Sequence, residues 1–251
     1  MILQLNPDAT LLYMLTVTRL SGLVVYSPVL GLNQVPMRVR LVFVLILASI
    51  LSAVVPTTAL PINSSGELAL AVMREFLIGA LIGLSVQVAF GALTLAGQML
   101  DYQVGFNAAA LFDRNTQAQN PLLSVLFGML GGVVFLTLDG HHLLLRAVAQ
   151  TMRVFPVGEG GFTVSPAVLA QEFGRVFVLG LTLASPVAIG VFLLDVATAF
   201  VSRTMPQLNV YFVALPLKVF WGLLLLSVTV THAGPTLQRL FSTAVAASLE
   251  H

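Results

Sequence analysis

The stretch that decides the fold runs from Phe76 to Leu100 and reads FLIGALIGLSVQVAFGALTLAGQML. It carries no charged residue and is longer than the ~20 apolar residues that a membrane-spanning helix needs. Other apolar stretches lie on both sides of it, at about 9–29, 41–55, 121–138, 176–201 and 210–230. The pattern predicts an all-α membrane protein with about six long hydrophobic helices in packed hairpins.

The composition excludes an ordinary soluble domain. Of the 251 residues, 58% are hydrophobic and 8% are charged, whereas a soluble domain has ~45–50% apolar and ~25% charged residues. The chain has 11 lysine and arginine residues against 10 aspartate and glutamate residues, without a block of like charge. We therefore expect no nucleic-acid-binding surface.

The single lysine and the absence of cysteine exclude several kinds of chemistry. The only lysine, Lys218, follows Leu217, so the chain has no Walker A loop. The absence of cysteine removes disulfides, thiolate ligands and a cysteine nucleophile. We expect no catalytic residue, no cofactor and no metal. The last residues, 249–251, read Leu-Glu-His and resemble the remnant of a purification tag, so they are left out of the fold prediction.

After residues 139–142, which read Asp-Gly-His-His, the sequence changes character. Apolar residues at helical spacing alternate with Arg146, Gln150 and Arg153, which predicts an amphipathic or interfacial helix. A metal site at the two histidines is not expected, because neighbouring residues of a helix point ~100° apart. We expect instead that Asp139 caps this helix, which suits the helix dipole.

Two ionisable residues interrupt the last two apolar stretches. The polar segment 203–209 joins these stretches into a helical hairpin, which places Asp195 and Lys218 each ~12 Å from the tip at ~1.5 Å per residue. Ionisable residues inside a membrane are costly and are usually paired. We expect a buried ion pair, with a proton or ion relay as the alternative.

Two glycine pairs with a spacing of four residues lie inside apolar stretches. They are Gly79 with Gly83, and Gly128 with Gly132. Such pairs give a helix a smooth face that another backbone can approach closely. Together they predict tight helix packing in an assembly.

The region from Gln98 to Asn115 places bulky apolar side chains after a glycine: Phe106, Leu111 and Phe112 follow Gly105. Non-helical backbone at membrane depth is tolerated only where it is buried in protein or lines a cavity, and an apolar constriction can close a pore by dewetting. Two interpretations stay open from the residues alone. The region is either a connector packed between helices or a loop that closes a pore.

A set of motifs occurs in order from about Thr18 to Val230. They are Arg19, Ser27-Pro-Val-Leu-Gly31, Val35-Pro-x-Arg-Val-Arg40, Gln103-x-Gly-Phe106, Phe112-Asp113, Phe135-Leu-x-x-Asp-Gly-His-His142, Pro206-Gln-Leu-Asn-Val210 and Leu215-Pro-Leu-Lys218. With these motifs the chain resembles the FliR/SctT family of type III secretion export-gate subunits, in which FliR is the flagellar form and SctT its injectisome counterpart.

The resemblance implies a subunit of the bacterial flagellar protein export gate without catalysis of its own. Such a subunit joins FliP and FliQ in the channel for unfolded export substrates, with FlhB and FlhA as further partners, in the bacterial inner membrane at the flagellar basal body. The resemblance also implies one membrane domain over residues 1–248. Its part at about 1–172 is FliP-like, and its part at about 173–248 is a FliQ-like helical hairpin.

The resemblance further implies that the loop after the Gly-Phe pair plugs the channel, with Gly105, Phe106, Leu111 and Phe112 as plug residues, and it favours the plug over the connector. One alternative is the equivalent injectisome subunit. Another is a transporter or channel working alone, which would have several ionisable residues facing one pathway, or inverted repeats. A membrane enzyme would need clustered acid, base or metal ligands.

Overall fold

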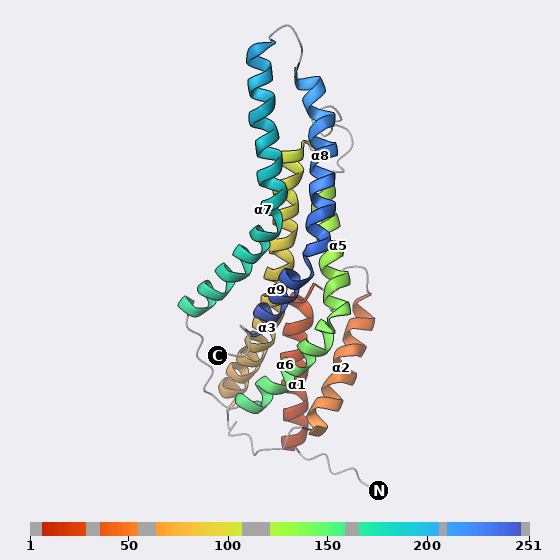
Figure 1. The fold of residues 1–251 in the computed structure, drawn as a ribbon. Coiled ribbons are helices and arrows are strands. Elements are labelled where there is room, and N and C mark those ends of the chain that lie inside the picture. The colour runs from red at the N-terminus through yellow and green to blue at the C-terminus, as the bar shows by residue number, and fades with distance from the viewer. Residues whose placement is uncertain are drawn as a thin grey trace. The chain divides into compact units, whose positions relative to one another are not determined.

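The structure is a computed structural model, and it describes residues 7–28, 36–54, 64–106, 121–158, 166–205 and 210–246. Every regular element in these ranges is an α-helix, which confirms the all-α prediction. The helices are α1 (Pro7–Tyr26), α2 (Met37–Val54), α3 (Ser65–Val104), α5 (Leu122–Thr137), α6 (Gly140–Val154), α7 (Pro166–Thr204), α8 (Val210–His232) and α9 (Gly234–Ala246) (Figure 1).

The apolar stretches of the sequence form α1, α2, α3, α5, α7 and α8. Within the described part of the chain, four helices are each long and apolar enough to cross a membrane: α1, α3, α7 and α8. Helix α5 has 16 residues and reaches that length only together with α6, from which a short break at Leu138 and Asp139 separates it. The protein is therefore an all-α membrane protein.

The chain divides into two compact units. Unit 1 comprises Met1–Val88, Asp139–Phe173 and Ser242–His251, and unit 2 comprises Ala89–Leu138 and Gly174–Phe241. The long helix α3 contributes its first part to unit 1 and its last part to unit 2. The division into a FliP-like and a FliQ-like part is a matter of resemblance and stays a prediction.

Unit 1 is built around a close contact between α1 and α3. A Cβ atom added to Gly79 would lie 1.7 Å from the carbonyl oxygen of Arg19, and one added to Gly83 would lie 2.7 Å from that of Leu23. On the facing helix, a Cβ on Gly22 would lie 2.4 Å from the oxygen of Phe76. Only glycine leaves room for this approach, which agrees with tight packing at the first predicted glycine pair.

Local sequence signals set the start of α3 and the face of α6. Ser64 Oγ accepts the N–H of Glu67, and a carboxylate oxygen of Glu67 accepts the N–H of Ser64, both at 3.3 Å, which is a capping box. The buried side chains of α6 recur at helical spacing, while Arg146 and Arg153 are exposed. The predicted amphipathic helix is therefore confirmed.

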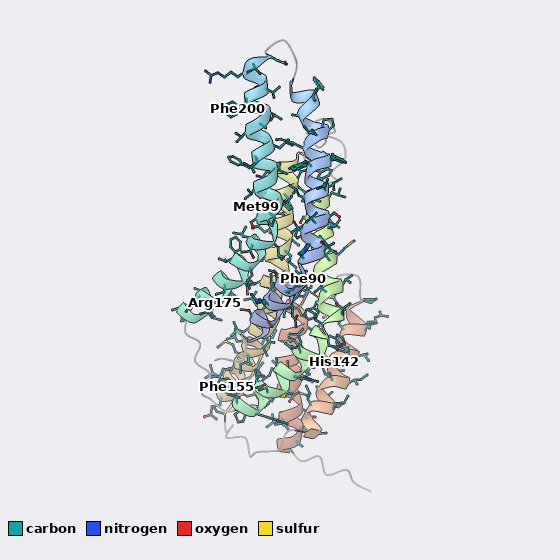
Figure 2. The ribbon with its side chains drawn as sticks, viewed as in Figure 1. Phe90, Met99, His142, Phe155, Arg175 and Phe200 are labelled. Carbon is teal, nitrogen blue, oxygen red and sulfur yellow. The ribbon has the colours of Figure 1, made fainter. Side chains whose placement is uncertain are left out.

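Unit 2 has an aromatic centre. The ring of Phe135, which is fully buried, lies 6.0 Å from that of Phe90 and 5.2 Å from that of Phe241, as measured between ring centroids. Phe90 and Phe241 are 5.3 Å apart, so the three rings form one cluster from α3, α5 and α9. Phe90 is labelled in Figure 2. Edge-to-face contacts of this kind add to the burial of the rings.

Helices α7 and α8 run side by side as the predicted hairpin (Figure 1). A Cβ added to Gly190 would meet Leu225 at 2.2 Å, so the two helices are in close contact there. Helix α7 is bent, and Pro186 lies in its interior. Proline cannot donate to the carbonyl four residues earlier, Thr182, and the hydroxyl of Ser185 donates to that oxygen instead at 2.8 Å.

Among the described residues, no other helix closely approaches the second predicted glycine pair. A Cβ on Gly132 would meet nothing within 4 Å, and one on Gly128 would meet only Thr94 at 3.5 Å. The close contact of α5 is at the neighbouring Gly131, where a Cβ would lie 2.6 Å from Leu93. A four-residue spacing alone does not tell which face of a helix meets another helix.

Candidate functional site

The end of α3 leads into the predicted plug loop. The N–H groups of Gly105 and Phe106 both donate to the carbonyl oxygen of Asp101 at 3.1 Å. Gly105 has a φ of 92°, so α3 ends in the left-handed glycine cap that is common at helix C-termini. A side chain at this position would strain the backbone. The glycine that precedes the bulky apolar residues of the predicted plug thus has a conformation that favours glycine.

The carboxylate of Asp101 binds the start of the next helix. Asp101 is fully buried. Its Oδ1 accepts the N–H of Leu123 at 2.9 Å, and its Oδ2 accepts the N–H of Ser124 at 3.0 Å. These N–H groups belong to the first turn of α5, and the N–H groups of a first turn have no acceptor within their own helix. The residue before the helix, Pro121, supplies no side-chain cap. The negative charge also suits the positive end of the helix dipole.

Helices α3 and α5 are packed backbone to backbone next to this cap. A Cβ added to Gly97 would lie 2.5 Å from Cα of Ser124, and the hydroxyl of Ser124 donates to the carbonyl oxygen of Thr94 at 3.0 Å. The two helix ends that border residues 107–120 are therefore held together. Of the predicted plug residues, Leu111 and Phe112 lie outside the described residues, while Phe106 is half-buried.

The end of α3 is also bound to α7. The side-chain amide of Gln103 donates to the carbonyl oxygen of Ala188 at 3.0 Å. Beside this bond lies an open groove of about 640 Å³, bordered by Met99 and Tyr102 on α3 and by Leu181 and Ala184 on α7. Met99 is labelled in Figure 2. Three helices of unit 2 thus meet where α3 ends.

The structure pairs Lys218 of α8 with Asp195 of α7 through the ammonium group and one carboxylate oxygen. The side chains remain 24% and 37% exposed, respectively, so within this chain the pair is half-buried rather than buried. The described residues of the chain therefore provide only part of the burial that the sequence predicted. Among the described residues, α8 is little covered, since only 11% of its most apolar segment is buried.

Sequence analysis missed the most buried ion pair of unit 1. Arg19 of α1 and Glu75 of α3 are 0% and 2% exposed, and Arg19 Nε lies 2.5 Å from Glu75 Oε2. A second guanidinium nitrogen, Nη2, donates to the carbonyl oxygen of Phe155 at 3.1 Å, and Glu75 Oε1 accepts the N–H of Gly158 at 3.0 Å. The pair thus joins α1 and α3 to the turn after α6, near Phe155 in Figure 2.

The prediction that Asp139 caps α6 is wrong. Asp139 stands directly before α6, but its side chain makes no hydrogen bond to the helix backbone. Its φ is 55°, whereas a capping side chain reaches the first turn from the β region of backbone conformation. The carboxylate lies 3.3 Å from Nδ1 of His142 instead.

The two histidines lie closer together than the sequence predicted. The ring centroids of His141 and His142 are 4.2 Å apart, and one ligand atom from each histidine and from Asp139 lie within 4.8 Å of one another. Because the free N–H groups of α6 make this end of the helix positive, a bound cation is disfavoured there. His142 is labelled in Figure 2.

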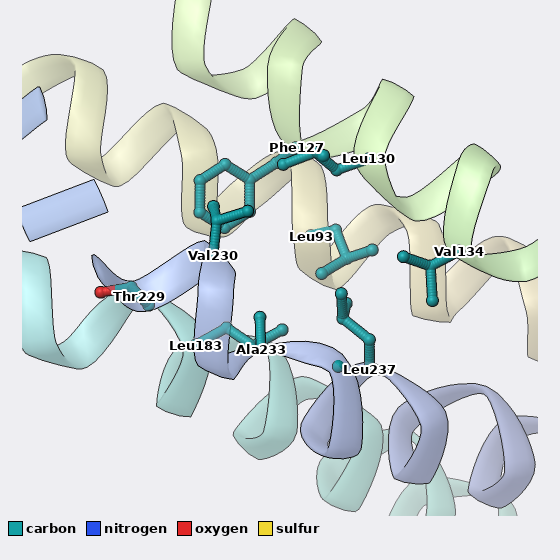
Figure 3. A pocket seen from close by; sticks show the side chains of 10 residues that line it. Leu93, Phe127, Leu130, Val134, Leu183, Thr229, Val230, Ala233 and Leu237 are labelled. Atoms are coloured by element: carbon teal, nitrogen blue, oxygen red, sulfur yellow. The ribbon is translucent and has the colours of Figure 1, made fainter. Parts of the chain in front are cut away.

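Figure 3 shows an apolar cavity of about 110 Å³ in unit 2. Its wall contains the hydroxyl of Thr229, which donates to the carbonyl oxygen of Leu225 at 2.8 Å. The other residues lining it are Leu93, Phe127, Leu130, Val134, Leu183, Val230, Ala233, Gly234 and Leu237. A cavity of this composition offers shape and no acid, base or nucleophile.

Comparison with known proteins gives one consistent result. The model of the family described as bacterial export proteins, family 1, matches residues 10–244. A flagellar biosynthetic protein FliR of Caulobacter vibrioides is 33% identical over 219 residues, which are 86% of this chain and 87% of that protein. The FliR protein of Bacillus subtilis is 29% identical over 93% of this chain and 91% of that protein. The FliR protein of Escherichia coli is 28% identical over 92% of this chain and 88% of that protein.

The match covers the helices of both units. It includes the end of α3 with Asp101 and Gly105, the α7–α8 hairpin and the buried pair of Arg19 and Glu75. The chain therefore belongs to bacterial export protein family 1, the family of the flagellar biosynthetic protein FliR, and is a membrane component of the flagellar export apparatus and not an enzyme.

Proposed function

We propose that this chain is the FliR-type subunit of the flagellar type III export gate. It forms the channel for unfolded substrates together with FliP and FliQ in the bacterial inner membrane, at the flagellar basal body, with FlhB and FlhA as further partners. The apolar loop that begins at Gly105 and contains Phe106, Leu111 and Phe112 plugs this channel.

The observation that carries the plug is the rigid border of the loop. Helix α3 ends at a left-handed glycine, and the carboxylate of Asp101 holds the first turn of α5 beside that end. An apolar constriction excludes water and ions by dewetting, and it needs no catalytic group.

Exposed apolar helix surface supports assembly with partner subunits and lipid. In the most apolar 18-residue segments of α7 and α8, only 33% and 11% of the segment, respectively, is buried within the described part of the chain. Large apolar side chains such as Phe200 and Phe220 are 66% and 65% exposed. Surfaces of this kind need lipid or other protein chains to cover them.

One experiment tests both parts of the proposal. The chain is coexpressed with FliP and FliQ, the complex is purified and reconstituted in vesicles, and potassium efflux is measured. Replacing residues 107–119 by a Gly/Ser linker of equal length is expected to raise efflux while export of flagellar substrates by cells persists. A matched variant, Leu111→Ile with Phe112→Leu, keeps the apolar bulk and should leave efflux low.

The two outcomes separate the parts. Failure of the three proteins to copurify, with a well-behaved single chain instead, would contradict the assembly. A stable complex in which the linker variant conducts no more than the natural chain would contradict the plug and leave the assembly in place.

A further inference from the structure

We propose that the apolar cavity of unit 2 binds a segment of the acyl chain of a membrane lipid. The cavity has a volume of about 110 Å³ and lies where α8 passes into α9, opposite α5 (Figure 3). All of its lining residues belong to unit 2, so the site is formed within one compact part of the chain. The inference concerns lipid and is independent of the proposed plug.

The chemistry of the cavity wall favours an apolar ligand. Among the described residues, the wall consists of aliphatic and aromatic side chains, a glycine and the hydroxyl of Thr229. This hydroxyl donates to the carbonyl oxygen of Leu225 one turn earlier in α8, so its proton is already used. A buried water molecule needs about two to four polar partners, whereas an apolar cavity of ~150 Å³ takes up benzene or xenon. We therefore expect the cavity to bind hydrocarbon.

Small residues at the junction of α8 and α9 contribute to this space. Helix α8 ends at His232 and α9 begins at Gly234, and Ala233 lies between them. A Cβ added to Gly234 would meet nothing within 4 Å. Figure 3 shows the short side chain of Ala233 at the wall, close to Leu237. Unfilled apolar volume costs stability, because the atoms around it lose van der Waals contacts, so entry of a hydrocarbon chain is favoured.

The cavity is continuous with a surface that lipid can cover. Two residues of its wall, Val230 and Gly234, are exposed, so the cavity reaches the protein surface on that side. Helix α8 is the least covered of the four helices of spanning length, with only 11% of its most apolar 18-residue segment buried within the described part of the chain. In a membrane, lipid tails are the medium against such a helix surface, and they are as apolar as leucine side chains. A lipid chain therefore reaches the cavity directly from its surroundings.

The test is photolabelling of the chain in its complex with FliP and FliQ, reconstituted in vesicles of phosphatidylethanolamine and phosphatidylglycerol. The vesicles contain a phosphatidylcholine with a diazirine group in its acyl chain, near the middle of the chain in one preparation and near its methyl end in another. Light attaches this lipid to the residues that the diazirine contacts, and mass spectrometry of peptides identifies them. Leu93 and Leu237 are decisive, because they are 1% and 7% exposed and lipid on the outer surface does not reach them.

Two variants change the cavity in opposite directions. Ala233→Leu fills it, and Val134→Ala enlarges it by removing methyl groups from its wall. Ala199→Leu is the matched control, because it makes the same change at an exposed position of α7 outside the described wall. We expect labelling of Leu93 and Leu237 in the natural chain and a decrease on the order of tenfold in Ala233→Leu, since the loss of about two buried methylene groups has that effect on an equilibrium. Labelling should persist in the other two variants, so Val134→Ala tests the inference even where Ala233→Leu does not assemble.

Labels confined to exposed residues such as Phe200 and Phe220, with Leu93 and Leu237 unlabelled, would overturn the inference. Lipid would then cover the surface without entering, as it would if a side chain of a partner subunit filled the cavity. Labelling of Leu93 that stays unchanged in Ala233→Leu would also contradict the inference, because the lipid would reach that residue by another route. None of these results depends on the plug, which the efflux measurement tests separately.

Discussion

The two parts of α3 each carry a buried acid, and the partner of that acid differs between them. Each carries one buried acid close to glycines that bring another helix into backbone contact: Glu75 with Gly79 in unit 1, and Asp101 with Gly97 in unit 2. Glu75 is paired with a guanidinium group, whereas Asp101 accepts hydrogen bonds from the first turn of a helix.

The difference indicates which structural feature each acid stabilises. A charged side chain as partner fixes two helices laterally, and removing one charge leaves the other buried and uncompensated. A helix terminus as partner fixes where that helix begins, and its charge is only about half an elementary charge. We therefore expect Glu75 to matter most for stability and Asp101 to matter most for where α5 begins.

The largest expected effect is that of Glu75→Gln. It removes the charge that compensates Arg19, and breaking one side of a buried pair costs about 3–5 kcal/mol. The measurement is the melting temperature and yield of the complex purified in detergent. Arg74→Gln changes an exposed charge at the adjacent position and is expected to have little effect. The double variant Arg19→Met, Glu75→Leu should recover most of the loss, and an equally severe loss there would contradict a role for the pair.

A smaller effect is expected from Gly79→Ala. The new Cβ would lie 1.7 Å from a carbonyl oxygen of α1, so the two helices must separate, at a cost of about 1–3 kcal/mol or more. Gly91→Ala is a matched change on the same helix where a Cβ meets nothing within 4 Å. That variant should be stabilised by about 0.5–1 kcal/mol, because alanine favours a helix interior over glycine. Equal melting temperatures for the two complexes would contradict the close contact.

These residues also show what the sequence could predict. The spacing of Gly79 and Gly83 is a local signal, and the contact it predicted is present. The same spacing at Gly128 and Gly132 marks no close helix contact among the described residues, and packing at this pair in an assembly stays a prediction.

The partners of the buried acids were beyond prediction, because they lie far from them in the sequence. An acid directly before a helix, Asp139, was predicted to cap it, but its backbone conformation turns the side chain away. The cap that does form comes from Asp101, across a loop, and Arg19 meets Glu75 from another helix altogether. Apolar length and helical periodicity are local properties, so the long apolar helices and the amphipathic helix α6 were predicted, whereas the short helix α9 was not.

The smallest effect is expected at the pair of Asp195 and Lys218. Both side chains are partly exposed, and the attraction between such groups is screened, so a double-mutant cycle with Asp195→Asn and Lys218→Met should give a coupling below about 1 kcal/mol for the chain purified alone. If partner subunits cover this face of the α7–α8 hairpin, the same cycle in the complex should give a larger coupling, because a covered pair loses its water. Equal coupling energies in the two preparations would mean that the pair remains open to water after assembly. The cycle therefore measures whether the half-buried pair of unit 2 becomes, in the complex, the counterpart of the buried pair in unit 1.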